Sequence, residues 1–376
     1  MHFHKRPNYW FVSLYIKSNK KKARVESINF IRKANRDFIL TGAGILSHLF
    51  GRFVFNSIGN RTMKMNRFRA ILSIMPIVLF ALSAQGGDKE MTKVAAGEFK
   101  KIYDPSVNEK EPWYINDHCF IRGRDGIWHM FGITRQEPAD PLNEIHLAHA
   151  TAKTLLQSPW EKQPFPLTAV RAEPWNEVHL WAPHVIEHAG LYYMFYCAGD
   201  KDHTKYKIHL ATSPDLKTWT RSPKNPMVVD GHDARDPFVK RVGDKWVMYY
   251  TATSDPKEGN HIVAYVTSDD LVTWGNRGVA YTDPAIGSWG GPTESPFVVN
   301  RGDLWYLFIG PRPEYDGTDV FVSKDPFHWD IKDKVGHIPA HAAEVVQDVD
   351  GKWYVSRCGW GRGGLYLAPL EWRDGK

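Results

Sequence analysis

The sequence repeats a pair of segments five times, and this repeat constrains the fold more than any other feature. The first segment of each pair is an aromatic, β-prone run, such as the one that begins at Gly190 or at Asp244. The second is a strand followed by a turn and a tryptophan, as in the segments ending at Trp219 and Trp274. Short strands that recur with a period of about 50–60 residues are typical of propeller blades.

The runs of Val, Tyr, Trp and Phe are bounded by Gly, Asp and Pro, which predicts short antiparallel strands joined by turns. No long pattern of helical period occurs between Tyr103 and Trp372. Apolar residues make up 43% of the chain, which excludes a disordered protein and suffices for a large core. We therefore predict an all-β fold, a single-domain five-bladed β-propeller with antiparallel four-stranded blades.

Charge is divided unevenly along the chain. Residues 1–84 hold 15 Lys and Arg and two acids, whereas the remainder holds 33 basic and 40 acidic residues. The net charge of +6 therefore originates in the front segment, and the rest of the chain is acidic. Because that part has no Lys- or Arg-rich stripe, we expect no nucleic-acid partner.

The basic front contains a candidate export signal. A short basic stretch begins at Met63 and is followed by an apolar run from Ala70 to Ala84 that ends in small residues. This order is typical of a secretory signal peptide, and the run is shorter than the roughly 20 residues of a membrane span. We expect an exported protein, periplasmic or secreted, with no stable membrane span.

The predicted organisation has four parts. In chain order they are an upstream mis-annotated or disordered basic segment at 1–62, a signal peptide at 63–85, an N-terminal lead-in at 86–102, and a catalytic propeller at 103–376. The alternative for the first part is a genuine basic N-terminal arm. The three cysteines follow no disulfide or zinc spacing, and we expect them to be free thiols.

The strand ahead of each aromatic run is the candidate innermost strand of its blade. In each case an ionisable residue stands ahead of an apolar stretch, at a similar distance from the aromatic run; the five residues are Asp117, His184, Asp236, Glu294 and Glu344. Because innermost strands converge on the propeller axis, we expect these side chains to share one pocket. Clustered carboxylates repel each other and shift each other's pKa values, so such clusters usually mark function.

Three carboxylates with aromatic walls are suited to cleaving a glycosidic bond. One stays ionised as nucleophile or base, another with a raised pKa protonates the leaving oxygen, and aromatic faces stack on the sugar. The predicted catalytic residues are Asp117, Asp236 and Glu294. The predicted substrate-binding residues are Asn116, His118, Trp181, His184, His232, Arg235, Thr293, His341, Glu344 and Arg357. Further candidate platforms and clamps, which a core or surface role explains equally well, are Trp113, Trp289, Trp360 and Arg312.

Three of these segments resemble known glycoside hydrolases. Trp181-Ala-Pro-His-Val resembles the Trp-Ala-Pro-Asp-Val segment of family 43. Arg235-Asp-Pro resembles the Arg-Asp-Pro motif of families 32 and 68, and the segment from Trp113 to Asp117 is similar to the Trp-Met-Asn-Asp segment of family 32. The resemblance spans about residues 103–372 and implies a five-bladed propeller with O-glycosyl hydrolase activity.

The resemblance also implies roles for individual residues. Asp117 corresponds to the general base of family 43 or the nucleophile of family 32, and Glu294 to the general acid. Asp236 corresponds to the residue that holds the substrate or tunes the acid. His341 resembles a histidine that faces a central water or metal ion, so a calcium-like ion near it is an option, although no cofactor is required. The chain departs from the families by having His184 in place of Asp.

The leading hypothesis is an exported glycosidase that cleaves a terminal bond of an oligosaccharide, polysaccharide or glycoside, with furanosides among the candidates. Retention and inversion both remain open, because they differ in the separation of the carboxylates. A non-catalytic carbohydrate-binding propeller is one alternative. A metal- or histidine-assisted sugar-active enzyme is another; the histidines that suggest it, which could equally hydrogen-bond to sugar hydroxyls, are His118, His184, His232 and His341.

Overall fold

The computed structural model describes residues 2–6, 9–13, 93–231, 233–255, 259–287 and 290–373. The chain divides into two compact units, Met1–Ser83 and Ala84–Lys376. In the first unit, β1 (His2–Arg6) and β2 (Tyr9–Ser13) pair as an antiparallel hairpin. The predicted signal peptide lies outside the described residues, as do two candidate site residues, His232 and Trp289.

The second unit is built from strands that pair in sequence order. The first sheet contains β5 (Trp113–Arg122), β6 (Trp128–Gln136), β7 (His146–Ala152) and β8 (Glu161–Gln163). The second contains β9 (Leu180–His188), β10 (Leu191–Ala198), β11 (Lys207–Ser213) and β12 (Thr220–Arg221). The third contains β13 (Arg235–Val242), β14 (Lys245–Thr253), β15 (Gly259–Ser268) and β16 (Gly275–Gly287). The short 3-10 helices are η1 (Pro141–Asn143), η2 (His203–Lys205) and η3 (Ile331–Asp333).

The remaining strands form a nine-stranded sheet that consists of two groups of four and one bridging strand. The fourth group contains β17 (Glu294–Arg301), β18 (Leu304–Gly310), β19 (Thr318–Ser323) and β20 (Lys334–Ile338). The fifth contains β21 (Val345–Gln347), β22 (Trp353–Arg357), β23 (Leu365–Trp372) and β4 (Lys100–Tyr103). The bridging strand β3 (Val94–Ala96) pairs with β23 and, in parallel, with β20. The all-β propeller fold is confirmed, and the five groups match the predicted number of blades.

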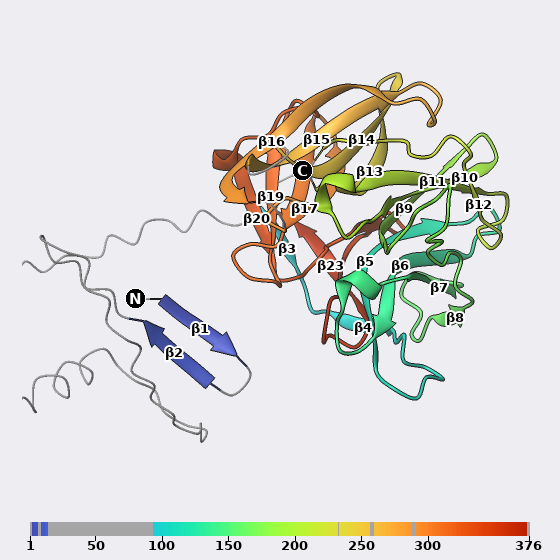
Figure 1. The fold of residues 1–376 in the computed structure, drawn as a ribbon. Helices are drawn as coiled ribbons and strands as arrows, with labels where there is room; N and C mark the ends of the chain where they lie inside the picture. The colour runs from blue at the N-terminus through green and yellow to red at the C-terminus, as the bar shows by residue number, and fades with distance from the viewer. Residues whose placement is uncertain are drawn as a thin grey trace, which may run out of the picture. The chain divides into compact units, whose positions relative to one another are not determined.

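The fifth group is completed by the beginning of the unit. Strand β4 pairs antiparallel with β23, and Figure 1 shows the cyan β4 below the red C-terminal strands. The chain then enters β5 of the first sheet, so first and last sheets become neighbours. Such closure leaves few open strand edges. Within the described part of the chain, no helix has the length and apolarity needed to cross a membrane.

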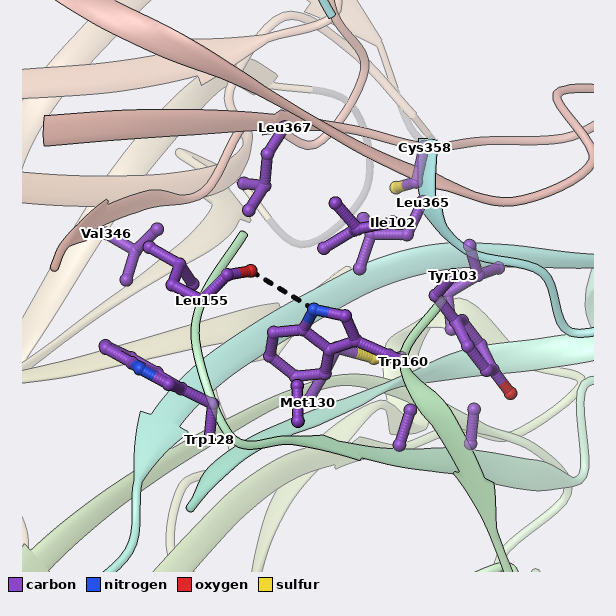
Figure 2. Close-up of a cluster of buried hydrophobic side chains, with 14 of the residues drawn as sticks. Ile102, Tyr103, Trp128, Met130, Leu155, Trp160, Val346, Cys358, Leu365 and Leu367 are labelled. Carbon is purple, nitrogen blue, oxygen red and sulfur yellow. Dashed lines mark hydrogen bonds between the residues drawn. The ribbon is translucent and has the colours of Figure 1, made fainter. Parts of the chain in front are cut away.

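Hydrophobic clusters fill the space between neighbouring sheets, and they hold the repeated tryptophans. Figure 2 shows the cluster between the first and fifth groups, in which Trp160 packs with Trp128 and Leu367. The indole of Trp160 donates a hydrogen bond to the carbonyl of Leu155 at 3.1 Å. The predicted free thiols Cys119 and Cys197 are confirmed and buried, and Cys358 is a buried free thiol as well.

Trp160→Ala is expected to lower the free energy of unfolding by about 3–5 kcal/mol, because it opens a cavity between two sheets and leaves a carbonyl unpaired. The side chain is only 3% exposed. Chemical denaturation measures the effect. Val349→Ala, at a side chain 69% exposed, is the control and is expected to change stability by less than about 0.5 kcal/mol. Equal effects of the two substitutions would contradict this account of the core.

Candidate active site

Bulges at the beginnings of the inner strands direct the polar side chains. In β9, β13 and β17 the register with the next strand shifts directly after Trp181, Arg235 and Glu294. The residue that follows each of them has a positive φ, 43° at Ala182, 55° at Asp236 and 50° at Ser295, and is itself followed by proline. A bulge turns the strand locally and re-aims its side chains. Strand β5 has a corresponding shift between Ile115 and His118.

The re-aimed side chains line one cavity of about 250 Å³. The three predicted catalytic carboxylates, Asp117, Asp236 and Glu294, all line it. Of the predicted substrate-binding residues, those that line it are Asn116, Trp181, Arg235 and His341. The structure thus brings together, from four sheets and the loop before β21, residues that are far apart in the sequence.

The Arg235 guanidinium is the cationic centre of this cavity. It is 4% exposed and pairs with Asp233 at 2.5 Å and with Glu294 Oε1 at 2.8 Å. Its Nε lies 3.6 Å from Asp236 Oδ2. Buried charges persist in proteins when they are paired and hydrogen-bonded, and Arg235 meets this condition by facing three carboxylates at once.

Ser295 connects two of the catalytic carboxylates. Its hydroxyl donates a short hydrogen bond to Asp117, and its backbone N–H donates to Asp236 Oδ2 at 3.1 Å. On the other side, His341 Nε2 lies 4.0 Å from Asp117 Oδ2, and His341 Nδ1 donates to the carbonyl of Tyr315 at 3.2 Å. Burial lowers the pKa of His341 to about 4, so its imidazole is neutral at neutral pH.

Burial raises the pKa of all three catalytic carboxyl groups, and that of Asp236 rises to about 7 although Arg235 opposes the shift. Burial raises the pKa of Glu294 to about 8; Arg235 opposes this shift, and the negative charges of Asp236 and Asp117 add to it. Burial also raises the pKa of Asp117, while the hydrogen bond from Ser295 opposes the rise. A carboxyl group whose pKa is raised to near neutral pH is suited to act as a general acid. Glu294 is therefore protonated at neutral pH.

Two predicted histidines and Glu344 face a different place. His184 donates to the carbonyl of Val239 at 3.1 Å, and the ring nitrogens of His118 lie 2.8 Å from Ser356 Oγ and 3.3 Å from Cys358 Sγ. Together with Glu344 they line a second, small cavity of about 10 Å³, roughly the room of one water, which Asp117 and Asp236 also line. In β9 the bulge lies between Trp181, which lines the main cavity, and His184. The five ionisable residues therefore do not occupy the equivalent positions on their strands that had been expected.

Two further predicted residues lie away from the main cavity. Thr293 is fully buried, and its carbonyl accepts a hydrogen bond from Thr251 Oγ1 at 2.7 Å. The Arg357 guanidinium lies over the rings of Phe99 and Tyr366, at 4.9 and 5.1 Å from their centres. Neither side chain lines the cavity that holds the carboxylates.

Two of the histidines considered for a metal site already contact protein groups. Protein groups already engage both ring nitrogens of His118, and Nε2 of His184 is occupied by a backbone carbonyl. Among the residues that the structure describes, no group of three or more His, Cys, Asp or Glu side chains is arranged to hold a metal. We therefore derive no catalytic step through a metal ion.

Loops supply cavity residues that the inner strands could not reveal. Glu144 follows η1, Tyr315 lies between β18 and β19, and Trp360 lies between β22 and β23. The rings of His341, Tyr315 and Trp360 form a stack, with neighbouring centres 4.0 and 5.4 Å apart. Trp360 had been a candidate platform because it follows an inner segment, whereas no motif marks Glu144 or Tyr315.

Comparisons with known proteins indicate the class of enzymes to which this propeller is similar. Residues 150–308 match the profile of glycosyl hydrolases family 43. No curated protein matches the chain. The profile match confirms the resemblance to family 43 over these residues and supports a glycosidase.

Solved structures show the same fold at low sequence identity. The RS223 β-xylosidase is 15% identical with a TM-score of 0.57, over 74% of this chain and 96% of that one. A family 43 β-xylosidase/α-arabinofuranosidase from a compost metagenome, solved with xylotriose, is 16% identical with a TM-score of 0.54, over 73% and 94%. The family 32 β-fructofuranosidase of Bombyx mori is 17% identical with a TM-score of 0.55, over 73% of this chain and 62% of that one.

Proposed function

We propose that the chain is a glycoside hydrolase that removes a terminal sugar, with Glu294 as the general acid and Asp117 as the base or nucleophile. One observation carries this proposal: three carboxylates meet in one cavity, and the pKa of Glu294 is raised to about 8. A cavity of about 250 Å³ lies at the small end of ligand pockets and suits a single sugar ring.

The arrangement supports a defined sequence of proton movements. Glu294 gives its proton to the leaving oxygen as the glycosidic bond breaks, and that oxygen keeps the bonding electron pair. Asp117 either takes a proton from an attacking water or bonds to the anomeric carbon. The negative charge of Asp236 raises the pKa of Glu294 and favours the positively charged transition state.

A panel of aryl glycosides tests the activity. Because xylosidases, arabinofuranosidases and fructofuranosidases share the fold, we propose terminal pentosides and furanosides as the substrates, and the panel therefore contains xylopyranosides, arabinofuranosides and fructofuranosides. NMR of the first product identifies the role of Asp117, since a base inverts the anomeric centre and a nucleophile retains it. Binding without turnover across the panel would contradict a hydrolase and favour a carbohydrate-binding propeller. Activity lost on chelation would favour the metal-assisted alternative.

Activity is expected to fall as the pH rises through about 8. Above the pKa of Glu294 the acid loses its proton, so the alkaline side of the kcat/KM profile follows this residue. Asp236→Asn removes a negative charge that raises this pKa, and the alkaline limb should therefore move to lower pH. Rates of the two proteins between pH 4 and 10 measure the shift. An alkaline limb that stays in place would show that another group titrates there.

We further propose that the propeller is exported. The first strand of the propeller unit, β3, begins at Val94, after the predicted signal peptide. N-terminal sequencing of the protein recovered outside the cytoplasm is expected to give a first residue near 86. A mature protein that begins before Ala70 would contradict cleavage of a signal peptide.

A further inference from the structure

Glu144 is a carboxylate in the cavity wall to which the proposed mechanism assigns no role. It follows η1 and is 1% exposed, yet it lines the cavity with the catalytic residues. The Tyr114 hydroxyl donates to its Oε1 at 2.7 Å, and the Trp360 indole donates to the same atom at 3.0 Å. Its backbone carbonyl accepts from the N–H of Leu180 at 2.9 Å. Tyr114 and Trp360 therefore hold the side chain of Glu144, and Leu180 holds its backbone.

The charge of Glu144 has hydrogen-bond donors but no cation beside it among the described residues. Burial raises its pKa to about 7; hydrogen bonds from Tyr114 and Trp360 oppose the shift, and the charge of Asp117 adds to it. Among the described residues, no Lys or Arg forms an ion pair with it. A buried acid without a cation costs stability, and a neutral acceptor would satisfy the same two donors. Packing alone therefore does not account for a carboxyl group at this position.

The cavity also offers no free cation to an acidic sugar. Arg235 is the one Lys or Arg among its described lining residues, and Asp233, Asp236 and Glu294 already surround that guanidinium. Four carboxyl groups line the same space, those of Asp117, Glu144, Asp236 and Glu294. Glu294 holds its proton at neutral pH, but the ionised members of this set would repel a sugar that carries its own carboxylate, whereas neutral hydroxyl groups can donate to their oxygens.

We propose that Glu144 is a specificity-determining residue that accepts a hydrogen bond from a hydroxyl group of a neutral sugar in the cavity and disfavours acidic sugars. The proposal rests on the proposed function and names its substrate class. The hydrogen bonds from Tyr114 and Trp360 both end on Oε1, and the Trp181 indole also acts on this carboxyl group. An ionised carboxylate has about four acceptor positions, so one remains for a sugar hydroxyl. The stacked ring of Trp360, fixed by the same carboxyl group, provides the adjoining apolar wall.

Calorimetric binding of D-xylose and D-glucuronate tests this proposal, because the two sugars share a ring and its hydroxyl groups and differ at C5. The unmodified protein is expected to bind xylose at least about tenfold more tightly than glucuronate. Glu144→Gln keeps the shape and one acceptor but loses the charge. This variant should bind xylose about fivefold to tenfold more weakly. Its affinities for xylose and glucuronate should therefore differ less than those of the unmodified protein.

If Glu144 has a purely structural role, the variant should bind both sugars more weakly by the same factor. An unchanged ratio of the two affinities would therefore overturn the proposal. Equal affinity of the unmodified protein for both sugars would also overturn it, without any variant. Glu137→Gln is the matched control, since Glu137 accepts from the N–H of Gly361 beside Trp360 but does not line the cavity. It should leave both affinities unchanged. If a panel of neutral pentoses, hexoses and uronates shows no binding at all, the proposed function itself is wrong.

Discussion

Glu294→Gln is expected to lower kcat/KM about 10²- to 10⁴-fold on a substrate with a poor leaving group, which is the usual contribution of general acid catalysis. Glutamine keeps the size of the side chain and an acceptor for Arg235, which donates to Glu294 Oε1 at 2.8 Å. The loss therefore reports the missing proton and not a change of fold. Steady-state kinetics on alkyl and aryl glycosides of the same sugar measure it.

The leaving group provides the control for this prediction. A dinitrophenyl glycoside needs no protonation of its leaving oxygen, so the same variant should retain most of its activity on it. The difference between the two substrates identifies Glu294 as the acid. An equal loss on both would mean that the residue acts in another step, and unchanged turnover on a verified substrate would remove it from the mechanism.

Asp117→Asn is expected to abolish measurable turnover, with a loss of about 10⁴-fold or more on both kinds of substrate. Because Asp117 acts on the attacking water or on the anomeric carbon, a better leaving group does not replace it. Kinetics on the dinitrophenyl and alkyl glycosides test this, and thermal unfolding confirms that the variant folds. Rescue of Asp117→Asn by the dinitrophenyl leaving group would contradict the assignment.

Ser295→Ala is the milder companion variant. The hydroxyl of Ser295 donates to Asp117 and opposes the rise of its pKa. Without this hydrogen bond the pKa of Asp117 should be higher, and the acidic limb of the pH profile should move to higher pH. An acidic limb that moves to lower pH would show that Asp117 does not determine it.

The fold could be predicted from the sequence because the strand pattern of one blade recurs along the chain. Each aromatic run forms a strand that packs against the next sheet, as Trp128 and Trp246 do in two separate clusters. Asp117, Asp236 and Glu294 were recognisable because they precede apolar inner strands. Their convergence in one cavity follows from that position and from the bulges beside them.

The rest of the site depends on features that carry no local signal. Trp181 and His184 are three positions apart on the bulged strand β9, and they line different cavities. Glu144 and Tyr315 reach the cavity through loops whose path depends on neighbouring sheets. Arg357 shares the polar character of the site residues, but its guanidinium lies over two aromatic rings elsewhere.

The pairing of β4 with β23 has a consequence for how the protein folds. Tyr103 of β4 pairs with Leu365 of β23, which lies near the other end of the propeller sequence. The fifth sheet can therefore form only after almost the whole chain is available. Contacts that are this distant in sequence make folding slow, because the entropy of closing a long loop is lost before the contact forms. Until β23 is synthesised, β4 has no sheet to join, and the ring stays open at this seam.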